Sequence, residues 1–272
     1  MIIVSDIGGS HMRIAVSDTP DSFEEPAVLD TPEDFDAAVA AFASAVTGLA
    51  HGRPITGGMV GLAGLLSPDR TVLLRSPHLR GWEGKNVTEA FSQAVGAPIR
   101  FENDVALGAL GEAKHGAGAG VSLVAYLAAG TGINGARVID GRLDRTAFGF
   151  EIGHQLLGSD ANATEWESLV SGSGVAQRYG KPSSEITDTA IWNECADYFA
   201  YGLYNTILYW SPERVVLGGS LFLKPSPIPL ERIKTTLRSI AFALPELPDI
   251  RLAALGDYSG LYGALDLAQT TA

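Results

Sequence analysis

A short polar run at residues 102–104 carries the residue types that proton transfer from a bound hydroxyl would need. Glu102, Asn103 and Asp104 follow the strand-like stretch "APIRF" and lead directly into the Ala/Leu/Gly-rich helical pattern "VALGALGEA". Because free N–H groups and the helix dipole favour an ionised carboxyl at a helix start, Asp104 is predicted to remain a base at neutral pH. Asn103 can both donate and accept hydrogen bonds, which suits a hydroxyl-bearing ligand. The alternative, in which Asn103 or Asp104 only caps the helix, stays open.

Two glycine turns could bind a phosphate chain. The stretch "DIGGS" places Gly8, Gly9 and Ser10 after a strand pattern, and "GTGING" begins at Gly130. The second stretch satisfies G-x-G-x-x-G, but "ARVIDG" follows it, with β-branched residues and then Asp-Gly, which is typical of a hairpin rather than of the helix that a dinucleotide-binding turn must open. Either a structural hairpin or one half of a paired phosphate site is consistent with the pattern.

Acidic residues occur directly before the first glycine turn and in the later segment "EIGH". Asp6 directly precedes the first turn, where it could hold Mg²⁺ directly or through water, or could be a solvated acid at the end of a strand. The segment "EIGH" separates Glu151 and His154 by three residues, which brings both to one face if the segment is helical.

The surrounding pattern predicts a duplicated α/β architecture. Strands are expected over 2–7, 12–16 and 55–62, and helices from an N-cap at Thr31 onward, over 87–95 and after residue 104 up to Gly116. A second hairpin pattern at 121–143 repeats the strand, glycine turn, strand order about 120 residues later. We therefore expect two α/β lobes with a cleft between them, over 1–115 and 116–259, with a C-terminal helix at 260–272 returning to the first lobe.

Composition narrows the function classes. The formal net charge of −12 would repel a phosphate backbone, so nucleic-acid binding is disfavoured and a small neutral substrate fits better. The single cysteine, Cys195, can form no internal disulfide, and the chain has no signal-peptide pattern and no long apolar run. We expect a cytoplasmic protein without a membrane partner.

Several strings in order along the chain resemble the ROK family of sugar kinases and repressors: "DIGGS", "GLAG", "SPHLRGW", "ENDVALGALGE", "AAGTGINGARVIDGRL", "EIGH", "WESLVSG", "VVLGGS" and "LGDYSGLYGAL". The resemblance covers nearly the whole chain. It implies the actin-like, hexokinase-like ATPase fold, with ATP and a sugar meeting between two lobes.

The resemblance also implies roles. Asp104 would be the general base and Asp6 the magnesium residue. The sugar-binding residues would be Asn103, Glu151, His154 and Glu167, and the ATP-binding residues would be Gly8, Gly9, Ser10, Gly130, Thr131, Gly132, Gly218 and Gly219.

The chain departs from the family pattern at two informative places. Relatives follow the "EIGH" histidine with a cysteine-rich loop that, with the histidine, forms a structural zinc site, whereas "QLLGSDANATEWESLV" has no cysteine, so we expect no structural zinc. The loop at 155–165 would then be ordered by packing, with Trp166 as the candidate anchor. His78 stands where an asparagine usually contacts the sugar, so it either contacts the sugar in this chain or turns away.

The leading interpretation is an ATP-dependent kinase for the 6-hydroxyl of a glucose-like hexose, acting as a homodimer. Fructose, another hexose or an N-acetylated amino sugar are alternative acceptors, and polyphosphate is an alternative donor. A repressor would need an N-terminal helix-turn-helix for which "DIGGS" at residue 6 leaves no room. A sugar-binding sensor without activity is the remaining alternative, although it would have no need for a base at Asp104.

Overall fold

The structure is a computed structural model that describes residues 1–158, 163–223 and 227–269. The chain forms two compact units, one of residues 1–115, 145–149 and the segment from Asp257 onward, the other of residues 116–144 and 150–256. The second unit was predicted as residues 116–259. The structure groups residues 145–149 and the segment from Asp257 onward with the first unit, in which the Arg70 guanidinium donates to the Thr146 hydroxyl at 3.5 Å and Arg13 pairs with Asp257 at 3.2 Å.

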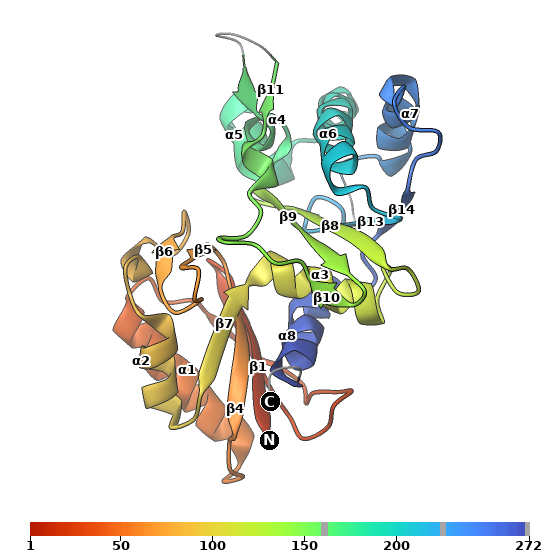
Figure 1. Ribbon diagram of the computed structural model, residues 1–272. Helices are drawn as coiled ribbons and strands as arrows, with labels where there is room; N and C mark the ends of the chain where they lie inside the picture. The colour runs from red at the N-terminus through yellow and green to blue at the C-terminus, as the bar shows by residue number, and fades with distance from the viewer. Residues whose placement is uncertain (159–162, 224–226, 270–272) are drawn as a thin grey trace. The chain divides into compact units, whose positions relative to one another are not determined.

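The first unit is built on a five-stranded mixed sheet in the order β3-β2-β1-β4-β7 (Figure 1). Its elements are β1 (Ile2–Ile7), β2 (His11–Ser17), β3 (Ala27–Asp30), α1 (Phe35–Ala50), β4 (Gly57–Leu62), β5 (Leu65–Leu66), β6 (Leu73–Arg75), α2 (Val87–Val95), β7 (Ile99–Asn103), α3 (Asp104–His115) and α8 (Ser259–Gln269), with short 3-10 turns at Arg80–Trp82 and Gly256–Tyr258. Strands β1, β4 and β7 run parallel, and β2 and β3 are antiparallel additions.

Alternate residues of the first sheet serve two cores, as a strand period of two requires. Ile3 and Ile7 of β1 pack with α1 and α2, whereas Val4 packs with α3 and α8 on the other face (Figure 1). Helix α8, over residues 259–269, therefore packs on this face of the first sheet, whereas residues 270–272 of the helix predicted over 260–272 lie outside the described part of the chain.

The start of α1 differs from the sequence prediction. The N-cap is Asp34, whose carboxylate accepts from the Ala37 N–H at 2.9 Å, and not Thr31. Thr31 instead holds the first glycine turn, because its hydroxyl donates to the Gly8 carbonyl at 2.8 Å and its N–H donates to the Ser10 carbonyl at 2.9 Å. The predicted helix over 87–95 is confirmed, with Gly96 as its left-handed C-cap.

The second unit repeats the same arrangement with the order β10-β9-β8-β13-β14. Its elements are β8 (Leu123–Ala129), β9 (Ile133–Ile139), β10 (Arg142–Leu143), β11 (Leu156–Leu157), β12 (Thr164–Glu165), α4 (Trp166–Val170), α5 (Gly172–Tyr179), α6 (Thr189–Trp210), β13 (Arg214–Gly218), α7 (Leu230–Ile240) and β14 (Asp249–Leu252), with 3-10 turns at Ile152–His154 and Ser183–Glu185. Here β8, β13 and β14 are parallel, and β9 and β10 are antiparallel.

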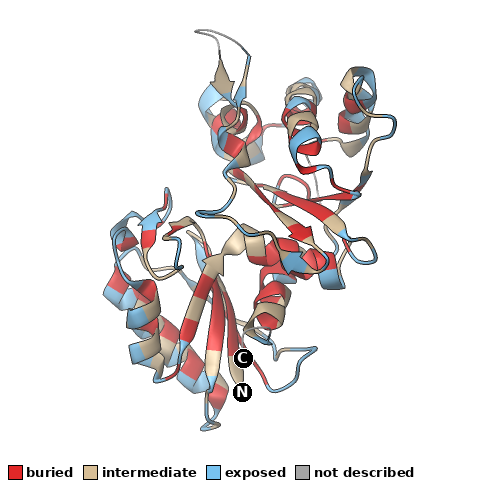
Figure 2. Cartoon of the chain, viewed as in Figure 1, coloured by how far each residue is buried: buried red, intermediate tan, exposed pale blue. Residues whose placement is uncertain are grey.

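Helices α4 to α7 share one core with the inner strands of the second sheet. Strand β13 is buried throughout. Figure 2 shows the buried residues, in red, along the strands of the sheets and on the helix faces that cover them. The second hairpin was expected to be a strand, turn, strand unit, and β8 and β9 confirm it, since "GTGING" leads into a strand and not into a helix. Among the described residues, no helix combines the length and apolar character that crossing a membrane would take.

Candidate active site

The candidate residues of the first unit gather at the carboxyl ends of its parallel strands, the edge at which open α/β sheets bind ligands. Asp6 is the penultimate residue of β1, and Asp104 begins α3 directly after β7. A methyl group added to Gly61 of β4 would lie 3.3 Å from both the Asp6 carboxylate and the Asp104 Cα. The two acids are therefore neighbours across one strand.

Burial dominates the electrostatics of this pair, although both residues keep some solvent contact. It raises the pKa of the Asp6 carboxyl to about 7, with the nearby Asp104 adding to the rise and Arg13 opposing it. Arg13 lies opposite Asp6 in the β1–β2 ladder and pairs with Asp257. The positive charge near Asp6 is thus too small to balance its carboxylate. This environment favours protonation of Asp6 or binding of a cation.

The pKa of Asp104 is also raised, which the sequence argument had not anticipated. Burial is the largest cause, whereas the N–H groups of Val105 and of Asp104 itself, together with His78, lower the value. The helix-start effect predicted from the sequence is present but is outweighed by desolvation. A raised pKa makes the ionised carboxylate a stronger proton acceptor, which suits a general base.

Asn103 does cap α3, as the structural alternative proposed. Its Oδ1 accepts from the Ala106 N–H at 3.1 Å, and its Nδ2 donates to the Gly64 carbonyl at 3.3 Å. The amide retains one further N–H and one further lone pair after these bonds. Capping and ligand binding are therefore compatible at this side chain.

Glu102 stabilises the junction between β7 and α3. Its carboxylate pairs with the Arg70 Nε at 3.0 Å and accepts from the Asn103 N–H at 2.9 Å. His78 is exposed and lies against the first glycine turn, since a methyl group at Gly9 would come within 2.4 Å of the His78 Cβ. The first unit thus brings Asp6, Gly9, His78 and Asp104 together.

In the second unit, two glycine turns follow the parallel strands β8 and β13. The Gly130 N–H donates to the Gly132 carbonyl at 2.9 Å, which closes the first of these turns. The second turn contains Gly218 and Gly219, and its Ser220 hydroxyl lies 3.3 Å from where a methyl group at Gly130 would be. The two turns are therefore adjacent, at the edge where a nucleotide would be expected.

The first residues of α5 bind the backbone of the Gly130 turn. The Gly172 N–H donates to the Gly130 carbonyl at 2.7 Å, and the Ser173 N–H donates to the Thr131 carbonyl at 3.1 Å. These bonds fix the turn that was predicted to contact phosphates.

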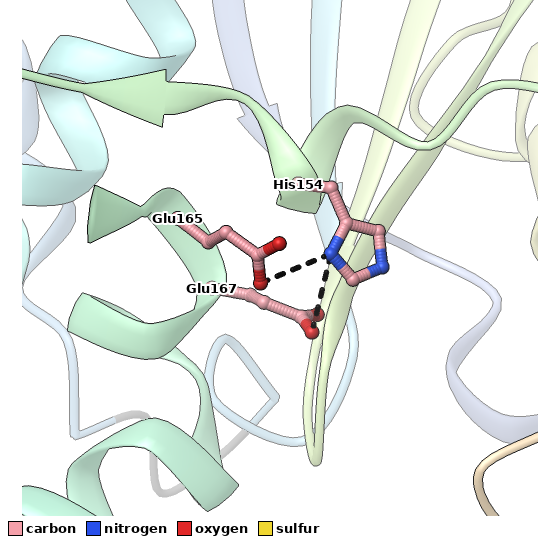
Figure 3. Close-up of side chains that lie close together, drawn as sticks. All are labelled: His154, Glu165 and Glu167. Atoms are coloured by element: carbon pink, nitrogen blue, oxygen red, sulfur yellow. Dashed lines mark ion pairs between the residues drawn. The ribbon is translucent and has the colours of Figure 1, made fainter. Parts of the chain in front are cut away.

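The candidate sugar-binding residues of the second unit lie beside that turn. Glu167 accepts from the Ile133 N–H at 3.1 Å, and His154 Nδ1 lies 3.9 Å from the Glu167 carboxylate (Figure 3). Glu151 immediately precedes the 3-10 turn that carries His154, and the His154 N–H donates to its carbonyl at 3.2 Å. Glu151, His154 and Glu167 therefore share one region of the second unit.

The segment after His154 is ordered by packing, as far as it is described. Trp166 is fully buried, and its indole N–H donates to the Tyr198 carbonyl of α6 at 3.1 Å. Residues 159–162, part of the loop whose ordering the sequence left to Trp166, lie outside the described residues.

Sequence reasoning missed two residues of these groups. Arg13 could have been found by pairing the predicted strands outward from the glycine turn, because that register places it opposite Asp6. Glu165, whose carboxylate lies 3.2 Å from His154 Nδ1, carried no comparable signal beyond its two-residue separation from Glu167.

Comparison with known proteins identifies the family of the chain. The model of the ROK family matches residues 2–271. The chain belongs to the ROK family. It is 27% identical to a glucokinase of Streptomyces coelicolor, over 97% of this chain and 96% of that protein. It is 31% identical to a fructokinase of Zymomonas mobilis, over 69% of this chain and 67% of that protein.

Among solved ROK structures, a glucokinase of Streptomyces griseus in complex with glucose and AMPPNP superposes with a TM-score of 0.80. The two chains are 25% identical, and the match covers 98% of each. The fold expected from the sequence, the actin-like ATPase fold of the ROK hexokinases, is thereby confirmed.

Proposed function

We propose that this ROK family phosphotransferase transfers the γ-phosphoryl group of ATP to the 6-hydroxyl of glucose or a closely similar hexose. The glucokinase relative aligned over nearly the whole chain, and the solved glucokinase with glucose and an ATP analogue, support this acceptor and donor. The fructokinase relative makes fructose the next acceptor to test, followed by other hexoses and N-acetylated amino sugars.

The observation that carries the proposal is the position of Asp104. This carboxylate begins a helix at the ligand-binding edge of the first sheet, beside a second acid, with a pKa that burial raises. Phosphoryl transfer to an alcohol needs a group that accepts the hydroxyl proton, while most of the remaining catalysis is positioning and charge neutralisation. Asp104 would accept that proton.

We propose that Asn103, Glu151, His154, Glu167 and His78 bind the sugar hydroxyls. Carboxylates accept from hydroxyls, whereas an amide and an imidazole can either donate or accept, so this set can distinguish the orientation of several hydroxyls on one ring.

Backbone N–H groups at the glycine turns would hold the nucleotide. The turns are Gly8, Gly9 and Ser10 in the first unit, and Gly130, Thr131, Gly132, Gly218 and Gly219 in the second. Successive N–H groups in such turns form anion-binding concavities. The order imposed on the Gly130 turn by α5 supports this role, because a fixed turn loses little freedom when a phosphate binds.

The surroundings of Asp6 fit a magnesium ion. Its carboxylate is desolvated, lies next to a second acid and has a pKa near 7, so a hard cation would relieve the unfavourable charge. When bound, Mg²⁺ neutralises phosphate charge and orients the transferring group. Asp6 would hold it directly or through water. The absence of cysteine around His154 leaves no thiolate set for a structural zinc.

Because the reaction consumes ATP, we place the enzyme in the cytoplasm. We also propose a homodimer, supported by three exposed apolar or aromatic side chains on α6: Tyr201, Leu208 and Tyr209.

The direct test is ADP release over a panel of glucose, mannose, fructose and N-acetylmannosamine, with ATP and Mg²⁺. Glucose is expected to give the highest kcat/KM, and NMR of the product is expected to show the phosphate on the 6-oxygen. A parallel series with polyphosphate in place of ATP tests the donor. Sugar binding by calorimetry without ADP release for any member of the panel would contradict the proposal and support a sensor.

A further inference from the structure

His154 lies between two carboxylates that both face the same ring nitrogen. Its Nδ1 is 3.2 Å from Glu165 Oε2 and 3.9 Å from Glu167 Oε1, and Figure 3 shows both acids on the Nδ1 side of the imidazole. Only the shorter distance is within hydrogen-bond range. Glu165 is therefore the nearer of the two acids and forms the shorter ion pair with His154.

The two acids have different tasks. Glu167 already accepts the Ile133 N–H and packs behind the Gly132 turn, where a methyl group at Gly132 would lie 3.0 Å from Glu167 Oε2. Within the described part of the chain, Glu165 makes no such bond to the turn, and its ion-pair partner is the His154 ring. Glu167 therefore contacts the Gly132 turn, whereas Glu165 contacts the His154 ring.

The backbone fixes Glu165 and His154 relative to each other. Leu156 pairs with Glu165 in the β11–β12 ladder, and the Trp166 N–H donates to the Gln155 carbonyl at 2.9 Å. The Gln155 side chain is in turn held to α6, since it accepts from the Asn205 amide at 3.0 Å. The residues on either side of the pair are thus anchored to the core of the second unit.

A carboxylate facing Nδ1 determines where a neutral imidazole carries its proton. An ionised carboxylate attracts an N–H and repels a lone pair, so the Glu165 charge beside Nδ1 favours the tautomer in which Nδ1 is the N–H and Nε2 presents its lone pair. In that tautomer Nε2 can accept a hydrogen bond from a hydroxyl.

We propose that Glu165 is a positioning residue that fixes the Nδ1–H tautomer of His154, so that Nε2 accepts a hydrogen bond from one hydroxyl of the sugar. The inference rests on the proposed function for the presence of a sugar at His154, whereas the tautomer itself does not. Positioning residues behind a ligand histidine are known to set both ring orientation and tautomer.

Three variants test the contact. Glu165→Ala removes the acceptor, whereas Glu165→Gln keeps an acceptor oxygen of similar reach. Glu194→Gln is the matched control, because Glu194 is as exposed as Glu165, at 43% against 46%, and forms an ion pair with Arg178 elsewhere in the same unit.

The first readout is the ¹⁵N spectrum of the histidine rings, recorded at pH 8.5 so that neutral imidazoles are observed, with the His154 signals identified through His154→Gln. In the wild type, Nδ1 is expected to be the protonated nitrogen. Glu165→Ala is expected to shift the population toward Nε2–H, and Glu165→Gln and Glu194→Gln to keep the wild-type pattern. A wild-type pattern in Glu165→Ala, or Nε2–H in the wild type, would overturn the inference.

The second readout is kinetic. Glu165→Ala is expected to raise the KM for the sugar about tenfold and to leave kcat within about twofold of wild type. The reason is that a misplaced His154 side chain weakens sugar binding, whereas Asp104 remains intact. Glu165→Gln is expected to restore most of the KM. Equal loss in Glu165→Ala and Glu165→Gln would contradict a role through hydrogen-bond acceptance. If the wild type has no kinase activity, the proposed function fails while the ring spectrum still decides the contact.

The same three side chains could hold a divalent cation, since one ligand atom from each lies within 4.8 Å of the others. Titration of metal-free protein with Zn²⁺, followed in the His154 ¹⁵N signals, distinguishes the two cases. We expect no stoichiometric binding and no dependence of the sugar KM on Zn²⁺. Tight one-to-one binding that Glu165→Gln abolishes would replace the hydrogen bond with a metal as the device that positions His154.

Discussion

Replacing Asp104 by asparagine separates its chemistry from its place in the fold. The substitution keeps the size of the side chain and leaves the helix cap untouched, because that cap is the Asn103 Oδ1 bond to the Ala106 N–H. It removes the only feature that a general base requires, a lone pair that can accept a proton near neutral pH.

The expected loss in kcat is about 10²- to 10⁴-fold, the usual contribution of a positioned general base. That range corresponds to about 3–5 kcal/mol of transition-state stabilisation. The KM for the sugar is expected to change little, since an amide still forms hydrogen bonds with a hydroxyl. Stability should change by less than about 1 kcal/mol, because the lost interaction with the helix dipole is offset by removing a charge from a buried position.

The assay is coupled ADP release with the preferred sugar, accompanied by urea unfolding of the same preparations. Asp36→Asn is the matched control, because Asp36 is an exposed acid in the first turn of α1 in the same unit. The control is expected to retain wild-type kcat. If Asp104→Asn folds normally and keeps more than a tenth of the wild-type kcat, Asp104 is not the base.

Three further outcomes follow from particular contacts. Gly263→Ala should destabilise the protein by about 2–3 kcal/mol, because its methyl group would lie 1.9 Å from a carbonyl of α3. Gly48→Ala, on the open exterior of α1, should stabilise the protein by up to about 1 kcal/mol. Urea unfolding measures the free energy of unfolding of both variants, and equal effects would contradict the packing argument. In protein free of nucleotide and divalent cations, the raised pKa of Asp6 means that the folded state binds the proton more tightly than the unfolded chain, so this stabilisation is complete below pH 3.8 and is lost as the pH rises through about 7. It amounts to at most about 4 kcal/mol, and Asp6→Asn should abolish this part of the pH dependence of unfolding; an unchanged profile would refute the assignment. Light scattering should give twice the 28.5 kDa chain mass for the wild type and for Phe242→Ser, and a lower mass for Tyr209→Ser; a monomeric wild type would refute the dimer.

Local sequence signals predicted the parts of the fold that depend on local geometry. Gly96 ends α2 in the left-handed conformation that the pattern required. The Asp-Gly pair in "ARVIDGRL" correctly indicated a hairpin, which β9 and β10 form after the Gly130 turn. The cap of α1 was misplaced because Thr31 and Asp34 are both good N-cap residues. What decided between them was a contact of Thr31 with the Gly8 turn, 23 residues away in sequence.

The candidate site was predicted as a set of residues but not as an electrostatic environment. The helix start at Asp104 could be seen in the sequence, and its effect on the pKa has the expected direction. Burial is larger and depends on strands and helices far apart in the chain, so no window of sequence contains it. The same is true of Glu165, whose role depends on a short ladder that aligns it with the residues after His154.

The way α8 closes the first unit has a consequence for biosynthesis. The helix packs against β1, β4 and α3, and a methyl group at Gly260 would lie 3.3 Å from the Asp6 carboxyl carbon. During translation, the ribosome releases residues 116–256 before α8 can dock. One face of the first sheet therefore stays uncovered until translation ends, and its apolar side chains are exposed to aggregation for that time.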